Sequence, residues 1–536
     1  MKGMVVAPHS IAVEEGVKIL RRGGNAVDAA LTTAFVQCVV GVRNCGIAGF
    51  GSLHVYIADS GEEKIIDFHG KAGSKAKPDI WEDIFIMENR SGYGITLKGN
   101  VNDRGYQSIA VSGTIKAFHE AMLRYGTMNW KELIEPAIPY AKKGYPVSGE
   151  QAIQWMFRGP REMKFNLTKA AEEIYLKEGN LYSAGEILVQ KDLGLTLDKI
   201  ATHGPDVFYS GEIGEKIAQD LEEHNSLITI QDWKTPKVVI SQPLTTEYRG
   251  YTISSNPAPG GGITLIEIFN ILEGYPLNQY DWSGLGSSAI DHMHLVVSAF
   301  KAAQQDRVNF VGDPAFIDVP TKKLISKKHA SKWRERINAG ERISIPRRQG
   351  NEEASTTHIS VVDSKGNSVS LTHSLSSGSG VVTPGLGFMY NSCMNCFDPI
   401  PGHPNSIAPG KSRITGIAPT LVFKDGELTI VIGAPGGNRI IGGIAQGIIN
   451  IIDHRMSPVE AVSAPRIDCQ WLDIVDVTRR IPSYLCDELM RTGHKVERSP
   501  FHYEFWPLVQ AISINRASGK VRGGSDPRSG GIALSE

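Results

Sequence analysis

The sequence has few cysteines for its length and no long hydrophobic run. Its 536 residues include six cysteines, which is too sparse for the disulfide framework of a small secreted scaffold. The longest apolar runs, such as residues 440–452, are interrupted by glycine and glutamine and are too short for a membrane span. A net charge of −1 gives no general electrostatic reason to bind nucleic acid or a membrane surface. We therefore expect neither of these partners.

What the chain does have is the composition of a folded protein with a substantial core, with 41% hydrophobic and 21% charged residues. Its length would allow three or four average domains, but no internal repeat or low-complexity linker divides it, so we expect its parts to share one core. The first nine residues contain a short apolar patch that ends at Pro8 and do not resemble a secretory signal. A cytoplasmic location is the expectation.

Helical periodicity dominates the first two thirds of the chain. Asn25 is placed to cap the second of two early helices, and the turn at residues 257–262 contains two prolines and three glycines. This turn is either a tight loop before a helix or a wall of the active site. Helices are predicted at residues 10–22, 115–125, 133–143, 214–223, 264–272 and 290–308, and strands at residues 53–58, 64–68, 238–241 and 251–254.

A hairpin that starts at two adjacent threonines, Thr356 and Thr357, is the centre of the sequence. Residues 347–353 before it are polar without periodicity and predict an exposed loop. Polar and apolar residues then alternate, as in a half-buried strand, and residues 364–367 supply a turn before the returning strand at 368–372. The pair is either an ordinary strand start or a cleavage point. Cleavage before Thr356 would place an α-amine, with a pKa of about 7.7–8.0, beside its own hydroxyl, which is a known way to activate a weak nucleophile.

A second hairpin, at residues 419–433, turns at Asp425-Gly426 and leads to Gly436 and Gly437 before an apolar helix at 439–452. Two glycines at a helix start can direct backbone N–H groups at an anion, although such glycines also serve as ordinary turns.

The run Ser-Thr-Thr-His-Ile-Ser-Val-Val-Asp at residues 355–363 resembles the processing site of the γ-glutamyltranspeptidase family of N-terminal-nucleophile hydrolases. Residues 23–30 and 46–51 resemble the start of that family and residues 525–528 resemble its end, so the likeness covers most of the chain. The resemblance implies an α+β fold. It is a four-layer αββα sandwich, with two stacked antiparallel sheets flanked by helices and built from both halves of the chain.

The family likeness also implies a precursor that cuts itself between Ser355 and Thr356. The large subunit would comprise residues 1–355 and the small subunit residues 356–536, with Thr356 as the nucleophile. Ser374 stands where the family has a threonine that hydrogen-bonds to the nucleophile, so a hydroxyl is retained; a solvated strand serine is the alternative. No cofactor and no metal are expected. Whether the processed heterodimers assemble into a homo-oligomer stays open.

The oxyanion hole of the family is formed by a Pro-Gly-Gly, which corresponds here to Gly436 and Gly437. The resulting mechanism is attack of the threonine hydroxyl on an amide, followed by resolution of the acyl-enzyme by water or an acceptor amine.

The residues that bind a γ-glutamyl group in the family are replaced here. His69 takes the place of an arginine that binds the α-carboxylate, and Cys393 and Cys396 occupy the positions of residues that bind the ammonium. The paired serines of the family become Thr415 and Gly416. Because a buried charge without a partner costs several kcal/mol, a γ-glutamyl donor should bind poorly.

We therefore expect an amidohydrolase for a small amide with one carboxylate, similar to oxamate, held by Arg439 or His69. Genuine γ-glutamyl transfer or glutathione hydrolysis is the second hypothesis. The third is a non-catalytic relative in which Cys393, Cys396 and His69 bind a metal.

Overall fold

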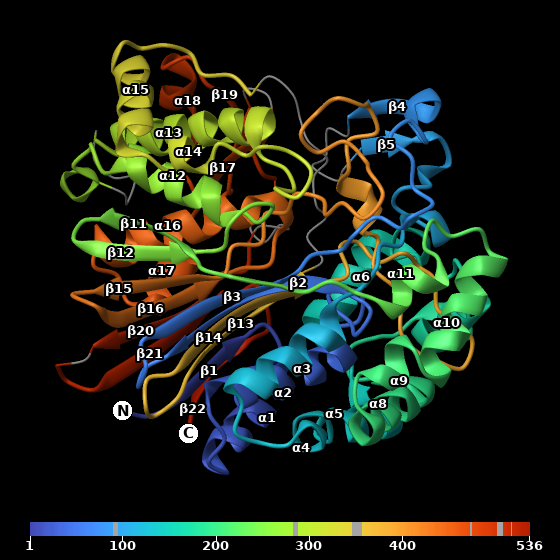
Figure 1. Ribbon diagram of the computed structural model, residues 1–536. Coiled ribbons are helices and arrows are strands. Elements are labelled where there is room, and N and C mark those ends of the chain that lie inside the picture. The colour runs from blue at the N-terminus through green and yellow to red at the C-terminus, as the bar shows by residue number, and fades with distance from the viewer. Residues whose placement is uncertain (89–94, 282–287, 346–355, 472–473, 501–506, 516) are drawn as a thin grey trace.

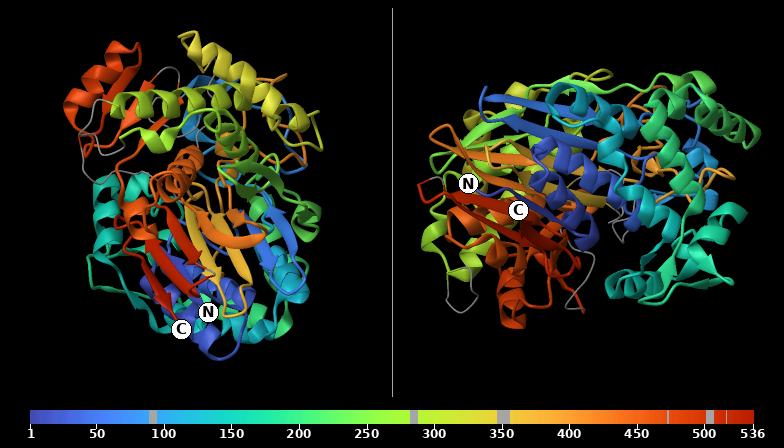
Figure 2. Two further views of the ribbon diagram at one scale, coloured as in Figure 1. Left: turned by 90° about the vertical axis from the view of Figure 1, so that its left-hand side faces the viewer. Right: turned by 90° about the horizontal axis from the view of Figure 1, so that it is seen from below.

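A computed structural model describes residues 1–88, 95–281, 288–345, 356–471, 474–500, 507–515 and 517–536 (Figure 1). Two stacked antiparallel sheets form its centre, and helices cover the outer face of each, which confirms the predicted αββα sandwich. The termini lie side by side at one end, where β1 pairs with β22 (Figure 2).

The first sheet combines strands from both ends of the chain. Its order is β10 (Val239–Ser241), β3 (Glu62–Phe68), β2 (Phe50–Ile57), β14 (Ser368–Ser374), β13 (Thr356–Val362), β1 (Met4–Ala7) and β22 (Ile532–Ser535). The order of the second sheet is β11 (Leu244–Tyr248), β12 (Tyr251–Ser255), β15 (Thr420–Lys424), β16 (Glu427–Gly433), β20 (Gln510–Asn515) and β21 (Lys520–Ser525). Neither sheet can therefore be assigned to one side of position 355, although a cut there stays a prediction.

The predicted hairpin at Thr356 forms as β13 and β14, but it is buried on both faces. The expectation of a half-buried strand is wrong because the second sheet covers the polar face. Ser370 Oγ donates to the carbonyl of Ile432 at 3.0 Å, and Ser360 Oγ donates to that of Gln510 at 3.2 Å. The apolar residues that alternate with these serines, such as Ile359 and Leu371, face the helices. The polar alternation thus marks a hydrogen-bonded interface between the two sheets.

Of the helices that cover the first sheet, the first two begin where the sequence predicts them. Asn25 caps α2 with a capping box, as predicted. The prediction of a single helix at residues 133–143 is wrong. The helix is interrupted at Pro136, which has no N–H to donate. These helices are α1 (Ser10–Arg21), α2 (Ala26–Val40), α3 (Thr114–Tyr125), α4 (Trp130–Ile134) and α5 (Ala137–Lys143).

Helices on the second sheet include the predicted apolar helix after the glycine pair. They are α12 (Gly262–Leu272), α13 (Ala289–Phe310), α14 (Thr321–Leu324), α15 (Lys327–Asn338), α16 (Ile440–Ile452), α17 (Pro458–Ser463) and α18 (Ser483–Arg491). A further helical group extends the first helix layer: α6 (Gly149–Glu162), α7 (Lys169–Tyr175), α8 (Lys191–His203), α9 (Asp206–Tyr209), α10 (Glu212–Glu223) and α11 (Ile230–Lys234).

Several small sheets lie outside the two large ones. The three-stranded one is β17 (Ile467–Trp471), β18 (Ile474–Val477) and β19 (Lys495–Arg498). The two-stranded ones are β4 (Phe85–Glu88) with β5 (Ile95–Leu97), β6 (Tyr145–Pro146) with β9 (Ile187–Leu188), and β7 (Leu176–Lys177) with β8 (Asn180–Leu181). No helix within the described ranges is both long enough and apolar enough to cross a membrane.

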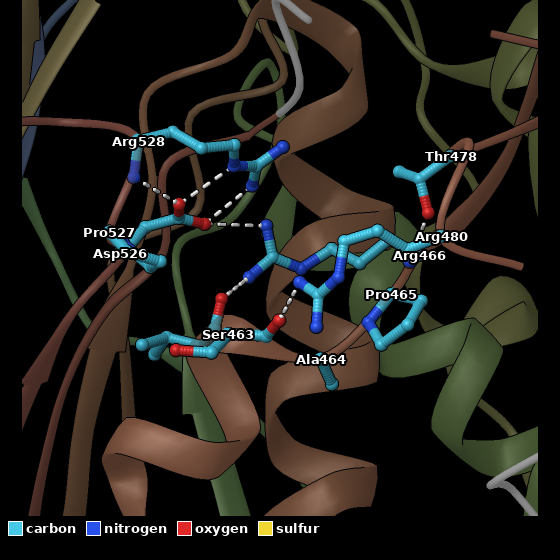
Figure 3. A pocket seen from close by; sticks show the side chains of 10 residues that line it. Ser463, Ala464, Pro465, Arg466, Thr478, Arg480, Asp526, Pro527 and Arg528 are labelled. Carbon is cyan, nitrogen blue, oxygen red and sulfur yellow. Dashed lines mark hydrogen bonds and ion pairs between the residues drawn. The ribbon is translucent and has the colours of Figure 1, made fainter. Parts of the chain in front are cut away.

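A buried charge cluster holds the C-terminal turn beside the second sheet (Figure 3). Asp526 accepts hydrogen bonds from Arg466 Nη1 at 2.9 Å and from Arg528 Nε at 2.7 Å. Burial alone would raise the pKa of Asp526, but the two guanidinium groups hold it below its ordinary value. Arg466 also donates to the carbonyl of Pro507 at 2.6 Å, so the cluster ties three separate segments together.

Candidate active site

Thr356 begins β13 and lies buried directly opposite Ser374. The two hydroxyl oxygens are 3.0 Å apart, a hydrogen-bond distance. Ser374 Oγ also accepts the backbone N–H of Ser376 at 2.8 Å. Ser374 is therefore not the solvated strand serine of the alternative interpretation. Ser355 and the predicted exposed loop at 347–353 lie outside the described residues.

His358 lies between the two sheets, two residues after Thr356. Its ring nitrogens contact Thr372 Oγ1 at 2.8 Å and Ser360 Oγ at 3.1 Å. Burial lowers the pKa of His358 to about 3, so the imidazole is neutral at ordinary pH. A β-carbon at Gly433 would lie 2.1 Å from the ring, so only glycine lets β16 approach this closely.

Gly436 and Gly437 lie at the same end of the sandwich as Thr356. Ser370 and its partner Ser360 lie near the middle of the hairpin, and Ser370 contacts Ile432, whereas His358 contacts Gly433. Moving along β13 from Ser360 to His358, toward Thr356, therefore corresponds to moving along β16 from Ile432 to Gly433, toward the glycines. Their φ angles are +142° and +63°, which favour glycine. The turn leads into η6 (Gly437–Arg439) and α16, as an anion-binding helix start requires.

Thr415 and Gly416 pack between this glycine turn and the proline-glycine turn at 257–262. The Thr415 N–H donates to the carbonyl of Pro259 at 3.0 Å, and the Gly261 N–H donates to that of Ile417 at 2.8 Å. A β-carbon at Gly416 would lie 2.3 Å from the Gly437 carbonyl oxygen. The turn at 257–262 is therefore both the loop before α12 and a neighbour of the candidate site.

His69, Cys393 and Cys396 are buried, as expected of pocket residues. His69 Nε2 lies 3.3 Å from Asp67 Oδ1, and a β-carbon at the next residue, Gly70, would lie 2.7 Å from Cys393 Sγ. The two cysteines occupy the short helix η5 (Cys393–Cys396). Within the described ranges these three residues do not bring three ligand atoms within 4.8 Å of one another, which argues against their proposed metal site.

Arg439 is held by two carboxylates. Its Nη2 lies 2.9 Å from Asp476 Oδ2 and its Nε lies 3.7 Å from Asp468 Oδ2. These ion pairs already balance the guanidinium charge, which weakens the case for Arg439 as the group that holds a substrate carboxylate.

Arg413 is a buried cation that the sequence analysis missed. Its guanidinium carbon lies 4.5 Å from the centre of the Phe50 ring, a cation–π distance. Phe50 pairs in register with Ser374, so Arg413 lies over the neighbour of the hydroxyl pair. Arg413 lies two residues before Thr415 in the sequence. This closeness could have marked it as a site residue only if the 413–416 segment had been known to line the site.

Asp103 and Lys164 were also missed, because they come from distant segments. Burial alone would raise the pKa of Asp103, but the Lys164 ammonium, 2.8 Å away, holds it below its ordinary value. Asn395 Nδ2 donates to Asp103 Oδ1 at 3.1 Å, and Ser376 Oγ donates to Asn395 Oδ1 at 3.1 Å. Asp103 is the acidic group nearest to the hydroxyl pair along this network, and its negative charge is already balanced by Lys164.

Comparison with known proteins decides the family, because the gamma-glutamyltranspeptidase family model matches residues 12–535. The chain belongs to the gamma-glutamyltranspeptidase family. It is 35% identical over 505 residues to the Acylase ACY 1 proenzyme of Pseudomonas sp. (strain V22), which covers 93% of this chain and 88% of the relative. It is 33% identical over 551 residues to the glutathione hydrolase proenzyme of Escherichia coli (strain K12). This alignment covers 98% of this chain and 90% of the relative.

A solved structure of cephalosporin acylase from Bacillus halodurans matches with a TM-score of 0.87 and 26% identity, over 99% of this chain and 95% of that chain. The family assignment makes the protein an N-terminal-nucleophile hydrolase, so the hypothesis of a non-catalytic relative is wrong.

Proposed function

We propose that the protein is a self-processing amidohydrolase whose nucleophile is the hydroxyl of Thr356. The observation that carries the proposal is the 3.0 Å contact between Thr356 Oγ1 and Ser374 Oγ at the buried start of β13. The proenzyme names of the relatives support a cut in the chain, here between Ser355 and Thr356. The products would be subunits of residues 1–355 and 356–536.

Self-cleavage begins when Thr356 Oγ attacks the carbonyl carbon of Ser355. The C–N bond breaks as the new C–O bond forms, and the hydroxyl proton passes to the released α-amine. Water then hydrolyses this ester, which returns the hydroxyl to Thr356 and leaves a carboxylate on Ser355. The residue now has its general base on its own backbone.

Turnover uses the same hydroxyl. Thr356 Oγ attacks the substrate amide while the α-amine accepts its proton and passes it to the departing amine. The Gly436 and Gly437 backbone N–H groups stabilise the oxyanion, a contribution of about 3–4 kcal/mol for such donors. Ser374 orients the hydroxyl. Water, or an acceptor amine, then releases the acyl group.

The substrate we propose is a small amide with a single carboxylate, similar to oxamate. A γ-glutamyl group would place an ammonium beside Cys393 and Cys396, which offer no carboxylate, and Asp103 is already paired with Lys164. Leaving the ammonium without a partner in a buried site would cost several kcal/mol. Relatives named acylases support a donor other than γ-glutamyl.

Arg413 is the proposed partner of the substrate carboxylate. Its planar guanidinium is always charged and can bind a carboxylate through two parallel hydrogen bonds. Its stacking on Phe50, the in-register neighbour of Ser374, supports a position within reach of the reacting amide.

The test compares ammonia release from oxamate with p-nitroaniline release from γ-glutamyl-p-nitroanilide. We expect turnover of oxamate and a KM at least about tenfold higher in Arg413→Lys, because lysine keeps the charge but loses the paired geometry. Arg439→Lys is the matched control and should leave KM for oxamate unchanged. An unchanged KM in Arg413→Lys would overturn the assignment of this residue.

Glutathione hydrolysis is the second candidate, favoured by the identity to the Escherichia coli glutathione hydrolase proenzyme. Efficient release of p-nitroaniline from the γ-glutamyl compound, with no ammonia from oxamate, would establish it instead.

A further inference from the structure

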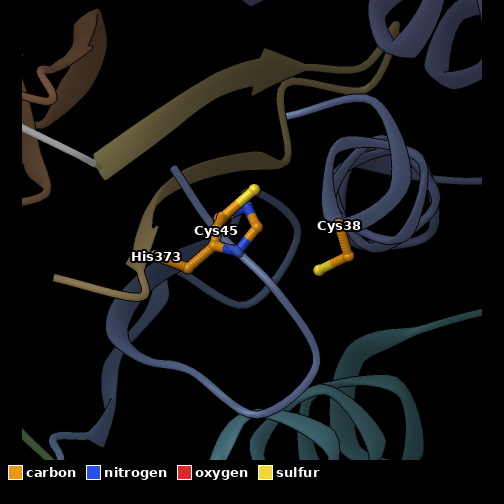
Figure 4. Close-up of side chains that lie close together, drawn as sticks. All are labelled: Cys38, Cys45 and His373. Atoms are coloured by element: carbon orange, nitrogen blue, oxygen red, sulfur yellow. The ribbon is translucent and has the colours of Figure 1, made fainter. Parts of the chain in front are cut away.

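Two cysteines and a histidine lie close together beside the end of α2 (Figure 4). Cys38 lies near the end of α2, Cys45 lies in the turn that follows, and His373 lies on β14. Their ligand atoms are within 4.8 Å of one another, and all three residues are buried. None of them has a part in the proposed reaction.

A second histidine borders the same space. A β-carbon at Gly41 would lie 3.0 Å from His9 Nε2 and 3.3 Å from Cys45 Sγ, so both atoms face the point where Gly41 has no side chain. His9 Nε2 and His373 Nδ1 are buried without a hydrogen-bond partner. Since a buried polar atom without a partner costs free energy, two such nitrogens beside two thiols call for a ligand.

His373 also has the outer contact that a metal-binding histidine requires. Its Nε2 lies 3.0 Å from Gln37 Oε1, an acceptor, so the proton belongs on Nε2 and the lone pair on Nδ1.

We propose that Cys38, Cys45, His373 and His9 bind a zinc ion or another thiolate-preferring divalent cation. Two thiols and two imidazoles form a common tetrahedral zinc set, with ligand distances of about 2.0–2.3 Å. Binding forms two metal–sulfur bonds and two metal–nitrogen bonds and releases the two thiol protons to solvent, so the occupied site is neutral.

The role of this site is structural. Four protein ligands leave no open position for water or substrate, as in closed zinc sites. His373 adjoins Ser374 but points to the opposite face of the sheet, toward α2. The ion would tie α2, the turn at 41–45 and the N-terminal segment to the strand that carries Ser374. The proposal departs from the expectation of no metal and does not depend on the substrate or on self-cleavage.

The experiment measures metal in the full chain, purified without chelator from cells supplied with zinc. We expect about one zinc per chain. Growth with cobalt in place of zinc should give a thiolate-to-cobalt charge-transfer band in the near ultraviolet. Cys45→Ser should lower the metal content to less than about one tenth of an ion per chain, whereas Cys486→Ser, a buried cysteine on α18, should retain it.

Metal content and the cobalt spectrum of the unmodified protein remain decisive even where Cys45→Ser fails to fold. The proposal is overturned if the unmodified chain contains no metal and shows no cobalt band. It is equally overturned if Cys38 and Cys45 form a disulfide, or if zinc persists when both cysteines are replaced.

Discussion

Two buried polar regions of this molecule are built in opposite ways. Around Thr356, hydroxyls, a neutral imidazole and backbone groups make the contacts, and Ser374 supplies the nearest hydrogen bond. At the C-terminal turn, Asp526 lies between the charged side chains of Arg466 and Arg528.

The contrast separates reactivity from stability. A neutral hydrogen bond contributes about 0.5–1.5 kcal/mol, so the region around Thr356 can exchange partners when the chain is cut. Removing one member of a buried ion pair costs about 3–5 kcal/mol, because the other charge stays buried without compensation. The covalent change thus occurs at a hydroxyl held by a neutral hydrogen bond, while the nearby cation, Arg413, stacks on Phe50. Each prediction below tests this division, from the largest expected effect to the smallest.

Thr356→Ala should abolish both cleavage and turnover, a loss of about 10³-fold or more in kcat, because it removes the nucleophile of both reactions. Dividing 58.3 kDa by length between residues 1–355 and 356–536 gives about 39 and 20 kDa for the normal fragments on a denaturing gel. The variant should show one band, and its free energy of unfolding in urea should be unchanged. Thr357→Ala is the control and should still be cleaved; cleavage of the Thr356 variant would contradict the mechanism.

Asp526→Ala should destabilise the protein by about 3–5 kcal/mol, measured as the free energy of unfolding in urea, because Arg466 would be left buried without its carboxylate. Glu173→Ala, which breaks an exposed pair with Lys169, is the control, with an expected change of about 1 kcal/mol or less. A loss of catalysis in folded Asp526→Ala protein would break the proposed division.

Acid should reproduce part of that destabilisation. The pKa of Asp526 is lowered in the folded state, so its stabilising contribution is present above the unfolded value of about 3.9 and is lost as pH falls through the lower folded value. Urea midpoints measured from pH 5 downward should fall more steeply for the unmodified chain than for Asp526→Ala. Parallel curves would exclude this carboxyl as a source of acid sensitivity.

Ser374→Ala should have the smallest effect, about a tenfold fall in kcat, because one neutral hydrogen bond to the nucleophile is lost. Ser374→Thr restores the hydroxyl and should restore the rate. The readout is kcat of fully cleaved protein, so that slow maturation is not mistaken for slow turnover. Failure of the threonine variant to recover would mean that the residue acts through packing.

Local signals in the sequence were enough for much of this fold. The capping residue Asn25, the Asp425-Gly426 turn and the alternation after Thr356 each specify structure through near neighbours, and the elements form where predicted. The full burial of the hairpin was missed because it depends on a second sheet. The break at Pro136 was present in the sequence but was outweighed by helical periodicity.

The site was predictable only in part, for a similar reason. Thr356, Ser374 and the glycine pair lie in recognisable runs. The position of Arg413 over Phe50 and the convergence of Cys38 with His373 join segments hundreds of residues apart, which no spacing rule reveals.

The most direct test of the central claim is N-terminal sequencing of the mature protein by Edman degradation. The account predicts a second sequence that starts Thr-Thr-His-Ile-Ser, with Thr356 as its first residue, in addition to the original N-terminus. A catalytically active preparation that yields only the original N-terminus would contradict it, because no α-amine would then lie beside the Thr356 hydroxyl.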